Sequence, residues 1–198
     1  MYSQYYYWGP LLWHTKISND IVNGLLERGL KTKTPYNHEL VGYFDDEYLY
    51  SEKDLDWFVD KMNPYFAEHK NVYENIWYMD KMKPLQLKSM WINIMRAGDF
   101  NPPHIHDGEF SFVIYLKIPE KLKEEFDSYK GASKESNGAG MIAFGIDTDI
   151  NKRDFITERT FFPEVGDMFI FPAKLMHYVT PFKCAGERIS VSGNLLLR

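Results

Sequence analysis

The chain has 198 residues, of which 44% are hydrophobic and 17% aromatic, and this composition excludes an intrinsically disordered protein. Its formal net charge is −5 and its basic residues form no concentrated stripe, so we expect no nucleic-acid partner. The single cysteine, Cys184, excludes an intramolecular disulfide and is typical of a reducing cytoplasm, and the length predicts one domain over residues 1–198.

The N-terminal residues, MYSQYYYWGPLLW, lack the basic region and the long apolar region of a signal peptide. Elsewhere no apolar stretch approaches the roughly 20 residues that a helix needs to span a bilayer. We therefore expect a cytoplasmic protein without a membrane partner.

Two helices are predicted before residue 70. The first is the amphipathic segment IVNGLLERGL (residues 21–30), which follows Ser18 as its N-cap. The second begins near Ser51 and covers residues 54–69, where Pro64 is expected to kink or divide it. A loop and a short extended segment are predicted between the helices. We thus expect N-terminal helices and extended segments over residues 1–70.

From about residue 71, short segments rich in β-branched and aromatic residues alternate with Gly, Pro, Asn and Asp. The predicted strands are residues 72–79, 85–97, 110–118, 140–146, 159–163, 167–172, 176–182 and 188–197. A short helix is predicted at residues 119–127 and a flexible loop at residues 128–140. The pattern predicts a mainly β fold with flanking helices, a cupin-like jelly roll (double-stranded β-helix) whose core occupies residues 71–198.

Two of the six histidines, His104 and His106, stand one residue apart in the segment NPPHIHDGEF. In extended backbone the side chains at i and i+2 point the same way, so both imidazoles can converge on one centre. His177 follows a later apolar strand and is a candidate third metal ligand. Taken alone, His177 has an alternative role as a buried histidine bonded to a backbone carbonyl.

Arg188 and Ser190 lie two residues apart in the last predicted strand and share one face of it. A guanidinium beside a hydroxyl suits a carboxylate, because it offers charge-assisted and supplementary hydrogen bonds. The alternative is that Arg188 pairs with its neighbour Glu187.

These motifs, in this order, resemble those of the iron(II)/2-oxoglutarate-dependent oxygenases, and among them a group of small phage-encoded oxygenases. The resemblance covers roughly residues 37–198, and its matching pieces are Trp91 with Asn93, HIHDG, SFVIYL, FPAKLMH and RISVSGN. It implies a jelly roll that uses Fe(II), 2-oxoglutarate and O2, with ascorbate as reductant, to hydroxylate a substrate. It implies His104, His106 and His177 as catalytic metal ligands. Arg188 and Ser190 would bind the far carboxylate of 2-oxoglutarate, and a phage-encoded protein would act in the cytoplasm of a bacterial host.

Most members of that family use His-x-Asp, in which the carboxylate completes a triad of two histidines and one carboxylate. Here the i+2 position is His106, and Asp107 follows one residue later. Because strand side chains alternate, Asp107 should face away from His104 unless a bulge intervenes. We therefore expect His104, His106 and His177 as ligands, with Asp107 in place of His106 as the alternative.

Tyr115 and Asn93 are further candidates for cofactor binding. The apolar face expected to pack outside the barrel consists of Phe110, Phe112, Ile114, Leu116 and Ile118. Tyr115 lies on the opposite, inner face, where the resemblance implies a hydrogen bond to 2-oxoglutarate; a bond to a backbone group is the alternative. Asn93 shares one face with Trp91 and Met95 and is expected near the cofactor.

Two other functions fit parts of the sequence. The Gly, Pro and His spacings around His104 and His177 also resemble the two motifs of a cupin metalloprotein that uses no 2-oxoglutarate. A non-catalytic phage structural or binding protein would keep the same barrel. The Arg-x-Ser motif favours the oxygenase, because a cupin does not need it. No motif identifies the substrate, which is expected to be a small molecule or a peptide or protein, or the oligomeric state.

Overall fold

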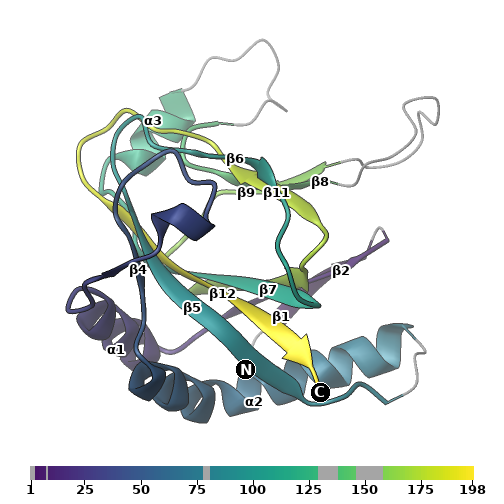
Figure 1. The fold of residues 1–198 in the computed structure, drawn as a ribbon. Helices are drawn as coiled ribbons and strands as arrows, with labels where there is room; N and C mark the ends of the chain where they lie inside the picture. The colour runs from purple at the N-terminus through teal and green to yellow at the C-terminus, as the bar shows by residue number, and fades with distance from the viewer. Residues whose placement is uncertain (1–2, 8, 78–80, 129–137, 146–157) are drawn as a thin grey trace.

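Two antiparallel sheets face each other in the computed structural model, with helices packed outside the larger one (Figure 1). The structure describes residues 3–7, 9–77, 81–128, 138–145 and 158–198. The strands of the large sheet are, in order, β1 (Ser3–Tyr7), β2 (Leu11–Lys16), β10 (Asp167–Pro172), β7 (Phe110–Lys117), β12 (Arg188–Leu197), β5 (Leu85–Met95), β4 (Glu47–Leu49) and β3 (Thr34–Pro35). Those of the small sheet are β6 (Asn101–His104), β11 (Met176–Val179), β8 (Ile142–Gly145) and β9 (Glu158–Phe161).

From β5 onward the chain alternates between the two sheets. β5, β7, β10 and β12 belong to the large sheet, whereas β6, β8, β9 and β11 between them belong to the small sheet. This winding is that of a jelly roll, so the expected mainly β fold of the double-stranded β-helix type is confirmed. Each strand expected after residue 84 has a counterpart, although residues 129–137 of the expected loop lie outside the described residues.

Helices α1 (Asn19–Gly29) and α2 (Glu52–Trp77) lie on the outer face of the large sheet, and α3 (Leu122–Ser128) follows β7 (Figure 1). A single 3-10 turn, η1 (Asn37–Glu39), lies in the segment before β4. The helices expected at residues 21–30 and 119–127 are thus confirmed. Within the described parts of the chain, no helix is long and apolar enough to cross a membrane.

Helix α2 differs from expectation in two respects. Pro64 lies inside one continuous helix and does not divide it. The prediction of a strand at residues 72–79 is wrong, because the helix continues to Trp77, and residues 78–79 lie outside the described residues. Met62 and Val72 both pack into the core beneath the large sheet, and this burial of a helical face outweighs the β propensity of the segment.

Strands from the N-terminal third complete the large sheet, which the sequence did not predict. β2 pairs with β10, and β4 pairs with β5. Along β2, Leu11 and Trp13 face the core under the helices, whereas Leu12 faces the inside of the barrel. The large sheet therefore includes strands from before residue 71, while the single domain over residues 1–198 stays a prediction.

β7 separates two apolar cores, as its alternation predicted. The residues of β7 that pack outside the barrel are Phe110, Phe112, Ile114 and Leu116. Val113 and Tyr115 pack inside, between the two sheets. Ile118, just beyond the end of β7, is an exception and packs with the inner core. The inner side of the large sheet is therefore the surface that can carry a site.

Candidate active site

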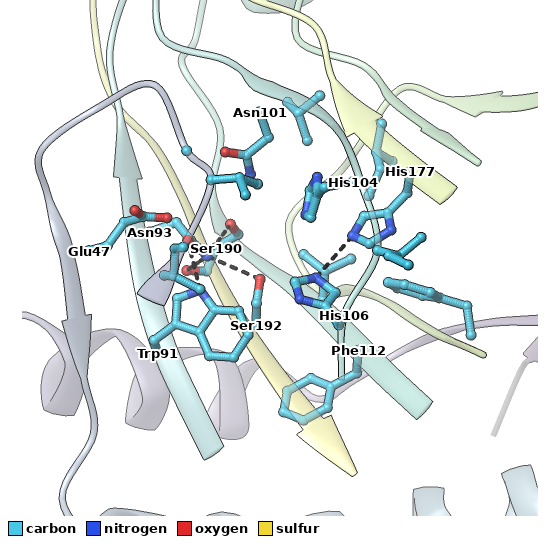
Figure 2. Close-up of a pocket in the computed structure, with 18 of the residues that line it drawn as sticks. Glu47, Trp91, Asn93, Asn101, His104, His106, Phe112, His177, Ser190 and Ser192 are labelled. Carbon is cyan, nitrogen blue, oxygen red and sulfur yellow. Dashed lines mark hydrogen bonds between the residues drawn. The ribbon is translucent and has the colours of Figure 1, made fainter. Parts of the chain in front are cut away.

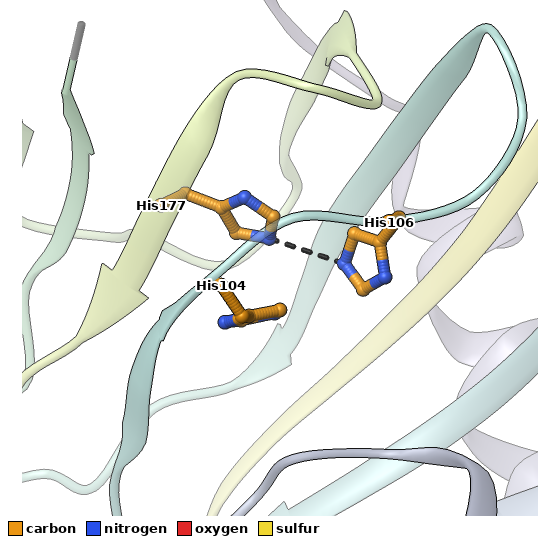
Figure 3. A group of neighbouring side chains, drawn as sticks. All are labelled: His104, His106 and His177. Atoms are coloured by element: carbon orange, nitrogen blue, oxygen red, sulfur yellow. Dashed lines mark hydrogen bonds between the residues drawn. The ribbon is translucent and has the colours of Figure 1, made fainter. Parts of the chain in front are cut away.

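Three histidines converge at one end of the barrel (Figure 3). His104 ends β6, and its partner across the antiparallel ladder is His177 on β11. His106 follows the end of β6, where its backbone N–H donates to the carbonyl oxygen of Ala173 at 2.8 Å. The small sheet thus presents two imidazoles side by side, and the backbone after β6 brings the third to them.

The distances between the imidazoles suit one metal ion. One nitrogen from each ring lies within 4.8 Å of the other two, and the Nε2 atoms of His106 and His177 are 3.1 Å apart. Imidazole nitrogens bind a divalent metal at about 2.0–2.1 Å, as in zinc sites, so two of them at a right angle lie roughly 3 Å apart. The His106–His177 separation fits that value.

The outer nitrogens of two of these rings are held by backbone carbonyls. His104 Nδ1 lies 2.7 Å from the Pro102 oxygen, and His177 Nδ1 lies 3.0 Å from the Leu175 oxygen. Donation from Nδ1 leaves Nε2 of each ring unprotonated, as in many metal sites. Burial lowers the pKa of His106 to about 4 and also lowers the pKa values of the other two histidines. Three neutral imidazoles are therefore available, and this donor set fits a first-row divalent metal.

Asp107 lies outside this cluster. Its side chain is 86% exposed, and its nearest charged neighbour is the Lys174 ammonium at 3.7 Å. The structure brings together the three histidines that were expected as ligands and leaves the alternative carboxylate in solvent. β6 ends at His104, and the segment after it brings His106 to the other imidazoles and leaves Asp107 beside Lys174.

A pocket opens beside the histidines, with about 670 Å³ of empty space when the open solvent at its mouth is included. The expected cofactor residues all line it, namely Asn93, Tyr115, Arg188 and Ser190. They come from β5, β7 and β12 of the large sheet, whose ladders set Ser190 opposite both Asn93 and Tyr115. A wider groove with Ile105, His106 and Lys174 along its wall continues from the pocket to the surface.

Arg188 is buried without a counter-ion among the described residues. Its side chain is 1% exposed, and its guanidinium donates to the Gly140 carbonyl at 3.0 Å and to the Met95 sulfur at 2.9 Å. Its Nε donates to no group in the described segments. The alternative pairing with Glu187 is wrong, because that carboxylate binds Arg96 and Lys117 instead. An unpaired buried guanidinium is costly to keep, and a bound carboxylate would compensate its charge.

Tyr115 and Ser190 add hydroxyl groups near this guanidinium. The Tyr115 hydroxyl is fully buried and bonds to no group of the described residues, so the alternative bond to a backbone group is not found there. Burial raises the pKa of Tyr115 to about 12, which keeps the hydroxyl neutral and able to donate. The Arg188 guanidinium carbon lies 5.6 Å from the centre of the tyrosine ring. Together these groups fit the carboxylate end of a small dicarboxylic acid.

Asn93 lines the pocket, and its amide bonds to neighbouring side chains. Its Oδ1 accepts from Trp91 Nε1 at 3.1 Å, and its Nδ2 donates to Ser192 Oγ at 3.1 Å and to Ser190 Oγ at 3.4 Å (Figure 2). Since its amide is occupied by neighbouring side chains, Asn93 holds Ser190 and Ser192 in place.

Two residues of the pocket were missed by sequence reasoning. Glu47 on β4 stands opposite Asn93 in the ladder, and Asn101 lies on β6 (Figure 2). Glu47 is 2% exposed although it belongs to a strand of three residues, for which no periodicity can be read. The only signal that could have identified it is the pairing of β4 with β5, which is a tertiary feature.

Part of the chain matches a known protein family. Residues 89–194 match the model of a protein family described as "Putative 2OG-Fe(II) oxygenase". No curated protein sequence matches the chain.

Solved structures share the fold. An oxidoreductase of the 2OG-Fe(II) oxygenase family from Burkholderia pseudomallei is 14% identical, with 88% of this chain and 77% of that chain covered and a TM-score of 0.57. A prolyl-4-hydroxylase from Pseudomonas putida is 13% identical, with 94% and 92% covered and a TM-score of 0.52. SnoN, an alpha ketoglutarate dependent epimerase from nogalamycin biosynthesis, is 12% identical, with 93% and 78% covered and a TM-score of 0.57. At these identities the likeness shows the fold alone.

Proposed function

Because the chain belongs to the 2OG-Fe(II) oxygenase family, we propose that it hydroxylates a C–H bond of a small molecule or a peptide. The observation that carries this proposal is one pocket with three converging imidazoles and an unpaired buried guanidinium in its wall. His104, His106 and His177 would hold Fe(II). Arg188, Ser190 and Tyr115 would hold the far carboxylate of 2-oxoglutarate.

When bound together, iron and 2-oxoglutarate supply the oxidising power: O2, 2-oxoglutarate and substrate R–H give R–OH, succinate and CO2. The residues of the chain orient these partners. The backbone carbonyls of Pro102 and Leu175 keep the imidazoles of His104 and His177 in the tautomer that leaves Nε2 unprotonated. Asn93 fixes Ser190 next to the carboxylate site.

Hydroxylation is the outcome that we propose, and the fold is compatible with it, since the Pseudomonas putida relative is a prolyl-4-hydroxylase. SnoN shows that an epimerase can have the same fold, so analysis of the product is part of the test. Ascorbate would serve as the reductant that keeps the iron ferrous.

The proposal is tested by titrating 2-oxoglutarate into the zinc-loaded protein, which binds without turnover. Arg188→Met removes the charge and keeps most of the volume, so it should weaken binding by about tenfold to more than a hundredfold, the equivalent of a charge-assisted hydrogen bond of roughly 1.5–3 kcal/mol. Arg188→Lys should recover part of the affinity, because the ammonium keeps the charge but loses the planar fork. Zinc stoichiometry should stay unchanged in both variants.

Arg96→Met is the matched control, because Arg96 also lies next to the end of β5 but is half exposed and paired with Asp46 and Glu187. It should bind 2-oxoglutarate as the wild type does. The wild-type protein with Fe(II), ascorbate and 2-oxoglutarate should also release succinate. A protein that binds metal but no 2-oxoglutarate would support the cupin alternative. Wild-type affinity in Arg188→Met would remove the carboxylate site proposed here.

A further inference from the structure

A buried carboxyl group lies in the same pocket and is not used by the proposed chemistry. Glu47 is 2% exposed, and its buried Oε2 has no hydrogen-bond partner in the part of the chain that the structure describes. Burial raises the pKa of Glu47 to about 7, and no neighbouring charge contributes to that shift. The side chain projects from β4 on the inner side of the large sheet, beside Asn93 (Figure 2). A buried carboxyl without a donor is destabilising unless a ligand supplies one.

A second unpartnered acceptor lies close to Glu47. Asn101, on the opposing small sheet, has a buried Oδ1 that accepts no hydrogen bond from any described residue. A Cβ atom on Gly42 would come 2.9 Å from Asn101 Oδ1 and 2.9 Å from Glu47 Oε1. The two oxygens therefore lie within twice that distance of each other. Gly42 lets the backbone of the preceding loop pass close to both of them.

The pocket keeps its opposite charges apart. Arg188 and Glu47 both line it and are both buried, yet neither has a salt-bridge partner among the described residues. The Glu47 carboxyl thus does not compensate the guanidinium. The other charged residue in the lining, Glu39, is an exposed acid at the mouth. The Arg188 guanidinium and the Glu47 carboxyl are consequently each left to a ligand, and the proposed 2-oxoglutarate would occupy only Arg188.

We propose that Glu47 and Asn101 bind a cationic group of the substrate, a protonated amine or a guanidinium, within the pocket that also holds the three histidines. The cation would donate hydrogen bonds to the Glu47 carboxylate and to Asn101 Oδ1 and would compensate the buried charge. The proposal rests on the proposed function, because it places the substrate's oxidised carbon near His104, which lines the same pocket.

The test uses the chain of 198 residues loaded with zinc and saturated with 2-oxoglutarate. Pentylammonium and butylguanidinium serve as cationic probes, 1-hexanol as a neutral probe and hexanoate as an anionic probe of similar length. Binding is followed by chemical-shift changes in amide correlation spectra. Cationic probes should bind more tightly than the other two, and their shifts should map to β4 and β6. Glu47→Gln should lower the affinity for the cationic probes by about ten- to a hundredfold and leave the affinity for 1-hexanol unchanged.

Two further variants test the second acceptor and an exposed acid. Asn101→Ala should lower the affinity for the cationic probes less than Glu47→Gln does, because a hydrogen bond to a neutral acceptor contributes less than one to a carboxylate. Glu39→Gln, which removes the exposed acid at the mouth, should change their affinity by no more than about twofold, because exposed charges interact weakly. Equal affinities for cationic and neutral probes, or unchanged cation affinity in Glu47→Gln, would overturn the proposal.

The same samples separate this proposal from the proposed function. If 2-oxoglutarate binds but the cations show no preference, the cation site fails and the oxygenase stands. If 2-oxoglutarate does not bind to the wild-type protein, the proposed function fails, whatever the probes show. Glu47→Gln should bind 2-oxoglutarate as the wild type does, since Glu47 does not touch Arg188.

Discussion

The buried carboxyl of Glu47 should give the protein a pH-dependent stability that one substitution removes. Its pKa is raised from 4.5 to about 7 in the folded chain. Between these values the unfolded chain has lost the proton and the folded chain retains it, so the folded state binds more protons. The free energy of unfolding must then fall as pH rises through this range. The full stability is present below the unfolded pKa and is lost above the folded pKa.

The change in the free energy of unfolding follows from the pKa shift of Glu47. Each pKa unit corresponds to about 1.36 kcal/mol, so a shift of about 2.5 units changes the free energy of unfolding by about 3 kcal/mol. Glu47→Gln cannot titrate and lacks this dependence. The difference in unfolding free energy between wild type and variant should therefore change by about 3 kcal/mol between about pH 4 and about pH 8, in favour of the variant at high pH.

The assay is urea unfolding of both proteins at a series of pH values, with a chelator present so that metal binding to the histidines does not contribute. Glu39→Gln is the control, because that exposed carboxylate should give a difference that stays within about 0.5 kcal/mol across the range. A wild-type to Glu47→Gln difference that is the same at all pH values would refute the reasoning. Glu47 would then be ionised in the free protein with hydrogen-bond donors around it, and it would need no cationic ligand.

Two other substitutions test the site and the sheet. His106→Ala should lose stoichiometric zinc binding in a calorimetric titration. Asp107→Ala should keep it, because the Asp107 side chain is 86% exposed and lies next to Lys174. If Asp107→Ala loses zinc and His106→Ala keeps it, the third ligand is the carboxylate. Gly193→Ala should lower the free energy of unfolding by roughly 1–3 kcal/mol, because its Cβ would come 2.5 Å from the Phe112 ring and 2.6 Å from the Ser89 carbonyl oxygen. An unchanged urea midpoint would show that the ring and this backbone both move aside at little cost.

The convergence of the three histidines could be predicted in part because the signal for two of them is local. Alternation along the extended chain put His104 and His106 on one side and Asp107 on the other, and the structure has this arrangement. The two faces of β7 followed from the same alternation, and Tyr115 lies inside as expected. In each case the spacing of a few neighbouring residues decides which way a side chain points.

Segments whose structure depends on distant partners were predicted less well. The residues before Trp77 have strong β propensity, but they continue α2 because Val72 packs on the large sheet. β2 and β4 are strands because β10 and β5 supply their hydrogen bonds. A strand of three residues, such as β4, has no period that its own sequence could reveal.

The sequence by itself determined which chemistry is available: three imidazoles for a metal, and an arginine and a serine on one face of a strand for a carboxylate. Only the tertiary structure decided which charges have no partner. Among the described residues, Arg188 has no salt-bridge partner because Glu187 binds Arg96 and Lys117 instead, and Glu47 has none because the pairing of β4 with β5 places it beside Asn93 in the pocket. Whether a charge is compensated depends on every residue around it, and the folded chain sets those neighbours, which sequence spacing does not specify.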